Sequence, residues 1–240
     1  MRLLVTRPTL DATRTSERLV ALGHQVLTDP VIEIEAFAPN IPQGDFAALI
    51  FTSANAVRVA AKLDALNPFK KLPVFTVGTH TAQVAREQGF ADVAAASGDV
   101  HALGNLLLAE LRSQMQLHVP LHLLHLSGED RAGDLAGVLS RTGIRIDTVT
   151  IYRARAAKSL QPKTVEAFRG GKLGGVLHYS ERSAAIFVQL AQAAGIGTEI
   201  VNARHFCLSQ AVAMPLKLFG AHPVVAVMPE EEALLELLDA

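Results

Sequence analysis

Residues 3–8 read LLVTRP, and the helical pattern that follows them closes on a glycine at residue 23. The same form returns at residues 123–128, which read LLHLSG and lead, with no gap, to a glycine at residue 143. Each copy is a short apolar run that ends in polar or small residues and continues as a helical pattern, which predicts a strand, a loop and a helix. The chain therefore contains an internal repeat, and this repeat decides the fold.

Three further pairs of segments belong to the same repeat, namely 49–63 with 176–190, 77–89 with 208–220, and 93–107 with 224–238. Their apolar runs do not alternate with polar residues, which is typical of a parallel sheet covered on both faces. Glycines stand where the helices should end, as C-caps often require. Alternating strands and helices predict a doubly wound α/β fold with right-handed crossovers.

The distribution of the expected strands predicts how the chain divides into domains. Two strands precede residue 30, five lie in the middle and three follow residue 170, and five strands make a common flavodoxin-like sheet. We predict an α/β protein with two flavodoxin-like parallel-sheet domains, one of them discontinuous, joined by a two-stranded antiparallel β linker. The expected ranges are 1–33 with 156–240, 38–148, and linker strands 31–37 and 148–155. The simpler alternative is two consecutive domains that split near residue 120.

Composition and charge exclude several classes of protein. Half of the 240 residues are hydrophobic and 19% are charged, so the chain can bury a core. The net charge is −1 and no Lys/Arg cluster occurs, which argues against a nucleic-acid partner. The first apolar run is too short for a signal peptide, and no run is long enough for a membrane span. With one cysteine, Cys207, an internal disulfide is excluded, and we expect a cytoplasmic protein without a membrane partner.

Polar residues follow the carboxyl ends of the predicted strands, where ligands bind in open parallel sheets. Because these loops also open helices, their N–H groups and positive dipole ends can hold anions. The alternative for each Ser or Thr is that it caps its own helix, which is compatible with binding. With two domains facing one cleft, we expect the set to bind carboxylates. The predicted substrate-binding residues are Thr6, Arg7, Ser53, Asn55, Thr79, Thr81, Ser127, Gly128, Arg131, Ser180, Arg182, Ser209 and Gln210.

Several catalytic signatures are missing from the sequence. It has no Gly-x-Gly-x-x-Gly after the first strand, no Walker A pattern and no Gly-x-Ser-x-Gly elbow. His122 and His125 lie three apart on a predicted strand, so their side chains should face opposite sides, and we expect no metal. Cys207 lies inside an apolar strand and is interpreted as a buried, inert thiol.

Tyr152 is one of only two tyrosines and lies on the predicted return linker. A phenol there can donate a proton to a leaving hydroxyl or hold a polar group of a substrate. The alternative is a tyrosine that only packs at the hinge. The other tyrosine, Tyr179, ends a strand that is predicted to face the same cleft.

Six short motifs, in order along nearly the whole chain, resemble those of the uroporphyrinogen-III synthase family. They are Val5–Pro8, Phe51–Val57, Val77–Ala82, Ser127–Arg131, Ile151–Arg153 and Leu208–Ala213. Each motif is weakly specific alone, but their order and the chain length match the family.

The second half departs from the family pattern at two places. The residues before Ser180 are His178 and Tyr179, where many relatives have Thr-Ser or Phe-Ser. Ala211 and Val212 stand where some relatives carry hydroxyl residues, which puts side-chain contacts from that turn in doubt.

The resemblance implies a cofactor-free, monomeric lyase with a mobile interdomain cleft. Such an enzyme cyclises hydroxymethylbilane, a linear tetrapyrrole rich in carboxylates, to uroporphyrinogen III with inversion of ring D and loss of water, in heme and siroheme biosynthesis. Tyr152 matches the family's linker tyrosine and would assist loss of the hydroxyl, while Arg7, Arg131 and Arg182 would bind carboxylates. Transient hand-over of substrate from porphobilinogen deaminase is the one protein contact expected.

Two other functions remain open at this level. A two-domain clamp could bind a small anion without turnover, since it shares the hinge and the cleft. A sugar or phosphate transferase could use the same doubly wound units, although the phosphate and nucleotide motifs are missing.

Overall fold

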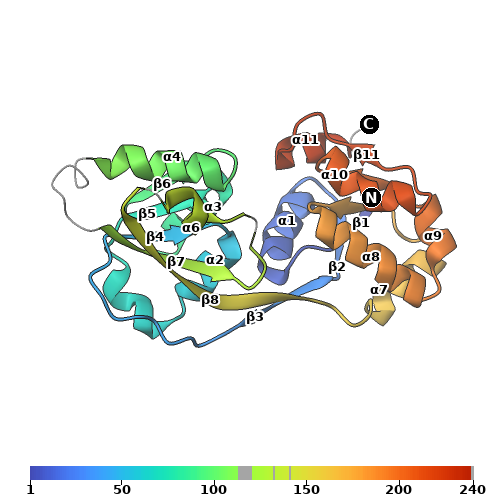
Figure 1. Ribbon diagram of the computed structural model, residues 1–240. Coiled ribbons are helices and arrows are strands. Elements are labelled where there is room, and N and C mark those ends of the chain that lie inside the picture. The colour runs from blue at the N-terminus through green and yellow to red at the C-terminus, as the bar shows by residue number, and fades with distance from the viewer. Residues whose placement is uncertain (113–120, 132, 141, 239–240) are drawn as a thin grey trace. The chain divides into compact units, whose positions relative to one another are not determined.

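The computed structural model describes residues 1–112, 121–131, 133–140 and 142–238. Contacts between residues divide the chain into two compact units (Figure 1). The first unit comprises Met1–Glu33 and Arg155–Ala240, and the second comprises Ile34–Ala154. The alternative boundary near residue 120 falls outside the described residues. Across the ranges given above, no helix is long and apolar enough to cross a membrane.

The first unit is built on a parallel sheet of five strands in the order β11-β10-β9-β1-β2. The strands are β1 (Arg2–Val5), β2 (Gln25–Thr28), β9 (Gly175–His178), β10 (His205–Cys207) and β11 (Val224–Val225). The helices are α1 (Thr9–Ala21), α7 (Pro162–Arg169), α8 (Glu181–Ala193), α9 (Gly197–Asn202), α10 (Gln210–Leu218) and α11 (Glu231–Glu236). One core of this unit packs Leu3 and Val5 of β1 against α1 and α11.

The second unit is built on a sheet of six strands in the order β3-β8-β7-β4-β5-β6. The strands are β3 (Ile32–Ala36), β4 (Ala48–Phe51), β5 (Val74–Val77), β6 (Val93–Ala96), β7 (Leu121–Gly128) and β8 (Ile144–Ala156). The helices are α2 (Ala54–Ala60), the 3-10 helix η1 (Asp64–Phe69), α3 (Thr79–Glu87), α4 (Val100–Glu110) and α6 (Leu135–Leu139).

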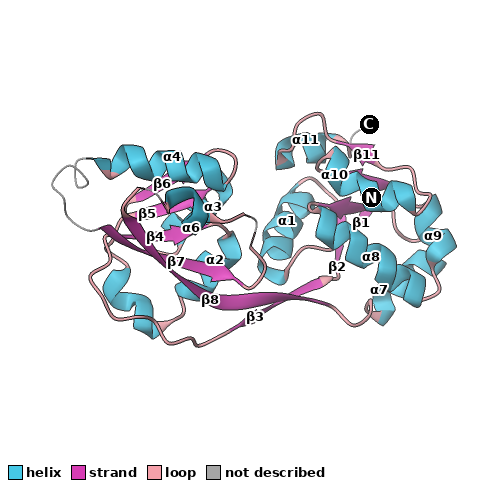
Figure 2. Cartoon of the chain, viewed as in Figure 1, coloured by secondary structure: helices cyan, strands magenta, loops and turns pink. Residues whose placement is uncertain are grey.

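Helices cover both faces of the second sheet (Figure 2). Because side chains alternate along a strand, Leu49 and Phe51 of β4 pack into one core, with α2 and α3. Ala48 and Ile50 pack into the other core, with α4 and α6. The predicted parallel sheet covered on both faces is therefore confirmed for its central strands, and β4 is apolar throughout for this reason.

The repeat relates the two sheets strand by strand. It pairs β1 with β7, β2 with β8, β9 with β4, β10 with β5 and β11 with β6. With these substitutions the order β11-β10-β9-β1-β2 becomes β6-β5-β4-β7-β8, which is the order observed in the second sheet. The first sheet has the flavodoxin order, and the second is a circular permutation of it. Gly23 and Gly143, at equivalent positions of the repeat, have φ of 82° and 78°, where glycine is favoured.

Strand β3 makes the second sheet one strand larger than the five we predicted. It can be added because β8 extends over 13 residues and leaves an outer edge for pairing. Phe37 N–H donates to Ile151 C=O at 2.8 Å, and Ala157 N–H donates to Val31 C=O at 2.9 Å. The residue numbers of the two pairs have the same sum, as antiparallel pairing requires. These bonds support the antiparallel linker, which stays a prediction.

Candidate functional site

The phenol of Tyr152 is tied to the start of helix α2 in the second unit. Its Oη donates a hydrogen bond to Ser53 Oγ at 3.0 Å. Ser53 is the N-cap of α2, and its Oγ also accepts from the N–H of Asn55 at 3.1 Å. A serine oxygen that accepts twice still has its own hydrogen to donate, so Ser53 can offer a hydrogen bond to a ligand. The ring of Tyr152 is only 8% exposed and packs in the core, so the packing role we considered is also real.

Gly128 makes room for this phenol. The β7–β8 ladder shifts register between Ser127 and Gly128, which places Gly128 opposite Tyr152. A Cβ atom at Gly128 would lie 2.7 Å from Cζ of Tyr152 and 2.8 Å from its Oη. Any side chain at this position would therefore displace the ring. The N–H of Glu129 donates to the carbonyl of Tyr152 at 2.9 Å and fixes the backbone there.

Strand β7 also carries two buried polar side chains, His125 and Ser127. His125 Nε2 is 3.4 Å from Thr52 Oγ1. Burial, together with the positive charge of Arg131, lowers the pKa of His125 to about 4, so the ring is neutral at physiological pH. Ser127 is fully buried, and its Oγ has no hydrogen-bond partner among the residues that the structure describes. Arg131 itself is exposed.

The remaining predicted residues of the second unit lie at the start of α3. Thr79 is exposed, whereas Thr81 is buried within the helix. Gly78 precedes the helix with φ of 79° and provides no side-chain cap, so the first N–H groups are left for other acceptors. Among the predicted residues, Ser53 bonds to the phenol of Tyr152, Asn55 bonds to Ser53, and Gly128 leaves the space that the ring fills.

The first unit gathers a second cluster of polar residues at the carboxyl edge of its sheet. Arg7 follows β1, and Tyr179 follows the neighbouring strand β9. Both donate to Oε1 of Glu231, at the start of α11, with distances of 3.3 Å from Arg7 Nη1 and 2.9 Å from Tyr179 Oη. The other donors come from α1 and are Thr15 Oγ1 to Oε1 at 3.0 Å, Arg18 Nη1 to Oε2 at 2.6 Å and Arg14 Nη2 to Oε2 at 3.4 Å.

Electrostatics in this cluster favour an ionised Glu231 and a neutral Tyr179. Burial raises the pKa of the Glu231 carboxyl, but the hydrogen bonds from Tyr179 and Thr15 and the charges of Arg7 and Arg18 more than offset it, so the pKa lies below its ordinary value. Burial and the negative charge of Glu231 raise the pKa of the Tyr179 phenol. The guanidinium carbon of Arg7 lies 4.0 Å from the centre of the Tyr179 ring, within cation–π distance.

Three predicted serines cap helices, as the alternative interpretation held. Besides Ser53, Ser180 Oγ accepts from the N–H of Ser183 at 3.1 Å, and Ser209 Oγ accepts from Val212 at 3.4 Å. The other predicted residues of the first unit have these places: Thr6 is buried with Oγ1 3.5 Å from the carbonyl of Leu177, Gln210 accepts from Lys217 Nζ at 2.9 Å, and Arg182 is exposed.

A buried histidine pair also lies in the first unit. His178 Nε2 is 3.0 Å from His205 Nδ1, and His205 Nε2 is 2.7 Å from the carbonyl of Ile200. Because a carbonyl only accepts, His205 carries its hydrogen on Nε2, and His178 must donate to the remaining nitrogen. Burial lowers the pKa of both rings, so both are neutral.

Four residues of this cluster were not predicted from the sequence, namely Thr15, Arg14, Arg18 and Glu231. Arg14 and Arg18 lie four residues apart and therefore share a face of α1, which was a signal that could have been used. Glu231 belongs to the acidic run at residues 230–232, which resembles an ordinary solvated helix start. Only the tertiary fold brings this run to α1.

The structure also places Cys207 and the two histidines His122 and His125, which the sequence singled out. Burial raises the pKa of the Cys207 thiol to about 12, so this residue is inert, as predicted. His122 Nε2 lies 2.9 Å from Asp147 Oδ2, while His125 lies beside Thr52. In the ranges that the structure covers, no group of three or more His, Cys, Asp or Glu side chains could hold a metal ion.

Comparisons with known proteins agree with each other. The family model described as uroporphyrinogen-III synthase HemD matches residues 13–236. The crystal structure of uroporphyrinogen-III synthetase from Helicobacter pylori is similar with a TM-score of 0.67 and 20% identity, over 99% of this chain and 98% of that one. A mutant uroporphyrinogen III synthase from Thermus thermophilus is similar with a TM-score of 0.52 and 17% identity, over 100% and 96% of the two chains. A comparison with curated proteins finds no match.

Proposed function

The chain belongs to the uroporphyrinogen-III synthase family and is therefore a lyase of tetrapyrrole biosynthesis; we propose that it cyclises hydroxymethylbilane to uroporphyrinogen III. The observation that carries this function is the family match over residues 13–236. The fold shared with the Helicobacter pylori structure agrees with it.

The proposed reaction begins with loss of the terminal hydroxyl of the substrate as water. The pyrrole assists this departure and becomes an azafulvene, so little acid strength is needed from the protein. Attack through the substituted carbon of ring D gives a spiro intermediate, which fragments and recloses with ring D inverted. Uncatalysed closure gives the type I isomer, so the main task of the enzyme is to position the substrate.

We assign the assistance of hydroxyl loss to Tyr152. The hydrogen bond from its phenol to Ser53 and the space left by Gly128 support this role, because they hold the phenol in one orientation. A positioned phenol can donate a proton or a hydrogen bond to the leaving oxygen.

The substrate carboxylates would bind to the hydroxyl-rich loops and helix starts of each unit. Ser53, Ser180 and Ser209 lie at helix N-termini, where backbone N–H groups and the helix dipole favour anions. The remaining proposed contacts are Thr6, Arg7, Asn55, Thr79, Thr81, Ser127, Gly128, Arg131, Arg182 and Gln210. Arg7 is engaged by Glu231 in this structure, so its part needs an exchange of partners.

The wider setting follows from the family and stays a proposal. We propose a monomeric, cytoplasmic enzyme with domains 1–33 with 156–240 and 38–148, linked by strands 31–37 and 148–155. It would receive its unstable substrate in a transient hand-over from porphobilinogen deaminase.

The isomer composition of the product tests the proposed function. Purified protein would be coupled to porphobilinogen deaminase without added cofactor, and the oxidised product would be resolved by chromatography. We expect mostly type III uroporphyrin, against only type I when the protein is omitted. Type I alone with the folded protein present would show that this chain does not direct ring closure.

A further inference from the structure

The carboxylate of Glu231 accepts more hydrogen bonds than an ordinary surface ion pair needs. Oε1 accepts from Arg7, Thr15 and Tyr179, and Oε2 accepts from Arg14 and Arg18. The Glu231 side chain is 11% exposed and the Arg7 side chain 15% exposed, so the cluster is largely shielded from water. Five donors around two oxygens fill all of the roughly four lone-pair sites of a carboxylate. This is the arrangement that a protein offers to a bound carboxylate ligand.

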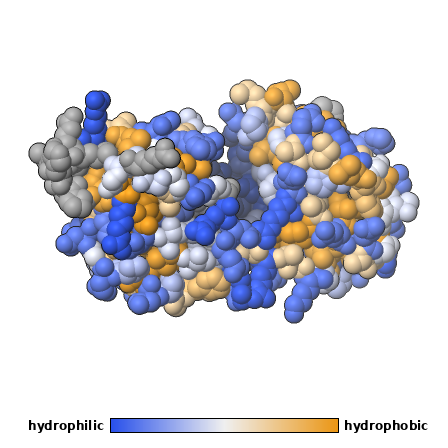
Figure 3. Space-filling view, viewed as in Figure 1, coloured by the Kyte–Doolittle hydropathy of each residue, from blue (hydrophilic) through white to orange (hydrophobic). Residues whose placement is uncertain are grey.

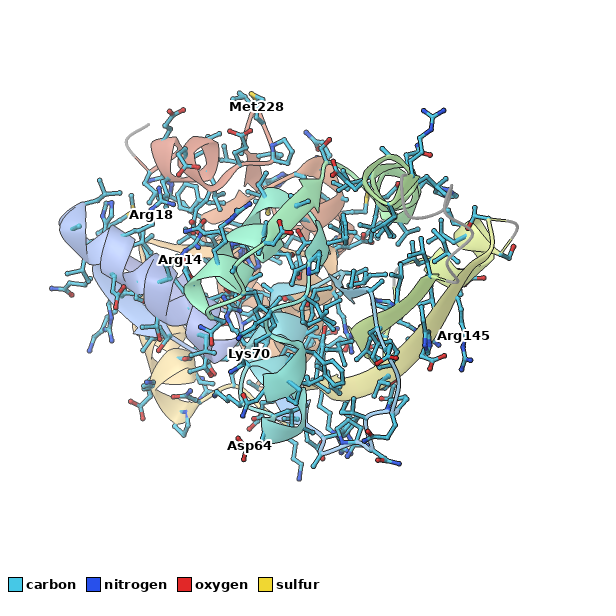
Figure 4. The ribbon with its side chains drawn as sticks, turned by 90° about the vertical axis from the view of Figure 1, so that its left-hand side faces the viewer. Arg14, Arg18, Asp64, Lys70, Arg145 and Met228 are labelled. Atoms are coloured by element: carbon cyan, nitrogen blue, oxygen red, sulfur yellow. The ribbon has the colours of Figure 1, made fainter. Side chains whose placement is uncertain are left out.

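The donors are placed by elements other than the helix that carries Glu231. Arg7 follows β1, and Tyr179 follows the adjacent strand β9. Thr15, Arg14 and Arg18 lie on α1, and Figure 4 labels the two arginines of this helix. Arg7 is also held without Glu231, because its Nη1 donates to Thr15 Oγ1 at 3.1 Å and its guanidinium stacks on Tyr179 at 4.0 Å. Part of the donor set is therefore held in place independently of Glu231, at the sheet edge where ligands bind in such folds.

The three arginines of the donor set favour the presence of an anion in the free protein. Arg7, Arg14 and Arg18 are permanently cationic, and they approach one another closely enough to bind the same carboxylate. Without an anion their mutual repulsion would destabilise the unit. Asp11 lies near Arg7 at 3.9 Å and Glu232 pairs with Arg18 at 2.9 Å, while Glu231 pairs with all three arginines.

Glu231, the carboxylate that these donors bind, lies at the start of a short helix. Helix α11 has six residues, and Val227 and Met228 in the loop before it are 87% and 55% exposed. Arg14 and Arg18 are also partly exposed, at 37% and 36%, and hydrophilic residues lie on the visible side of α1 (Figure 3). A ligand carboxylate can thus approach these arginines from solvent.

We propose that Arg7, Arg14, Arg18, Thr15 and Tyr179 form a carboxylate-binding pocket that Glu231 occupies in the free protein. A carboxylate of the ligand exchanges with Glu231, so the internal carboxylate keeps the arginines in place and competes with the ligand. This inference rests on the proposed function only for the identity of the natural ligand, a substrate that carries many carboxylates. The pocket itself is argued from the contacts.

Chemical rescue tests the pocket without any enzymatic reaction. Glu231→Ala leaves the donors without an acceptor, and propionate should then bind in place of the missing side chain and raise the unfolding temperature. At roughly five times its dissociation constant the rise should be about 2–4 °C. Propionamide, which has the same shape without the charge, should give no such rise. Equal effects of the two compounds, or no effect of either, would overturn the proposal.

Glu232→Ala is the matched control, because it removes a carboxylate from the same helix that is 69% exposed and pairs with Arg18. Propionate should not stabilise this variant beyond its effect on the wild type. If Glu231→Ala does not fold, Glu231→Gln keeps the shape of the side chain and can be titrated with propionate in the same way. A rescue of the Glu232 variant equal to that of the Glu231 variant would contradict a specific pocket.

Kinetics with the natural substrate test the competition. Since Glu231→Gln removes the internal charge, its KM for hydroxymethylbilane should fall several-fold, with kcat changed less. An unchanged or higher KM would overturn the competition and leave Glu231 as a purely structural anchor. Absence of turnover in the wild type would instead reject the proposed function, while the propionate experiment would still decide the pocket.

Discussion

Tyr152 is fixed at both ends of its residue. Its carbonyl accepts from the N–H of Glu129, and its phenol donates to Ser53. In a resting state with this geometry the phenol hydrogen points at Ser53 Oγ, whose own hydrogen is left to donate. A ligand oxygen near Ser53 could therefore be reached by either hydroxyl.

Replacing Tyr152 by Phe tests whether the phenol takes part in the chemistry. We expect kcat to fall by at least about tenfold, less than the roughly 100- to 10,000-fold that a positioned acid typically contributes, since the substrate itself assists the departure of its hydroxyl. KM should change little, because the ring keeps its packing. Single-turnover kinetics with hydroxymethylbilane would measure the effect. Normal turnover would reject the catalytic role.

Ser53→Ala separates positioning from proton donation. It removes the partner of the phenol and a helix cap, but leaves the phenol itself, so kcat should fall less than in Tyr152→Phe. Its free energy of unfolding should fall by about 1 kcal/mol through loss of the cap. A larger loss of kcat than in Tyr152→Phe would instead make Ser53 the group that meets the substrate.

The buried pair His178 and His205 makes the stability of the first unit depend on pH. Burial lowers the pKa of both rings below the ordinary 6.5, so the unfolded chain binds protons that the folded unit does not. Stability is thus complete above about pH 6.5 and falls as the pH decreases below it, by about 1.4 kcal/mol per pH unit for each proton.

His178→Gln should reduce this acid sensitivity. The amide can still donate to His205, and one titrating group is lost. Urea unfolding at pH 7.5 and 5.5 should show the difference in free energy shrink by about 1 kcal/mol. His222→Gln, at an exposed position of the same unit, is the control. An unchanged difference in the His178 variant would mean that other groups govern the acid sensitivity.

At the scale of elements, several of the predicted binding residues at helix starts also cap those helices. Ser180 accepts from the N–H of Ser183, and its own hydroxyl donates to Ser183 Oγ at 2.7 Å. The capping role of Ser180 and its proposed ligand-binding role can be separated, because asparagine caps a helix as well as serine does.

Ser180→Ala and Ser180→Asn distinguish these two roles. The alanine variant should lose about 1 kcal/mol of stability, whereas the asparagine variant should keep it. If Ser180 binds substrate through its hydroxyl, the asparagine variant should nonetheless have a raised KM. Thermal unfolding and initial rates on the same samples would give both answers. A wild-type KM in Ser180→Asn would limit Ser180 to capping.

The sequence was sufficient for elements that repeat and insufficient for contacts that close the tertiary structure. The apolar runs at residues 3–5 and 123–126 predicted strands correctly because both are buried on both faces. The pairing of residues 31–37 with 148–155 was predicted, but β3 was not counted as a sixth strand of the second sheet, since a half-exposed strand does not reveal whether it extends a sheet. Glu231 was missed for a related reason: nothing local distinguishes a solvated acidic residue from one that meets arginines more than 200 positions away in the chain.

For the whole molecule, the two units should differ in their ability to fold alone. Residues 34–154 contain the sheet β8-β7-β4-β5-β6 as one continuous stretch with both of its cores. Residues 155–240 contain β9, β10 and β11 but lack β1, whose Leu3 and Val5 lie in the core. The first fragment should show cooperative unfolding by circular dichroism, and the second should not. Cooperative folding of 155–240 alone would show that β1 and α1 are dispensable.

The permuted order of the two sheets has a consequence for synthesis on the ribosome. Strands β1 and β2 emerge before the whole of the second unit, yet β9, the second neighbour of β1 in the sheet, begins only at Gly175. The second unit can be complete while residues 155–240 are still being made, which takes about 4–17 s at typical elongation rates. During this interval the apolar edge of β1 has no neighbour on the β9 side, which is the state in which nascent chains associate with chaperones or with one another. The segment that is translated before the second unit therefore completes its fold after that unit.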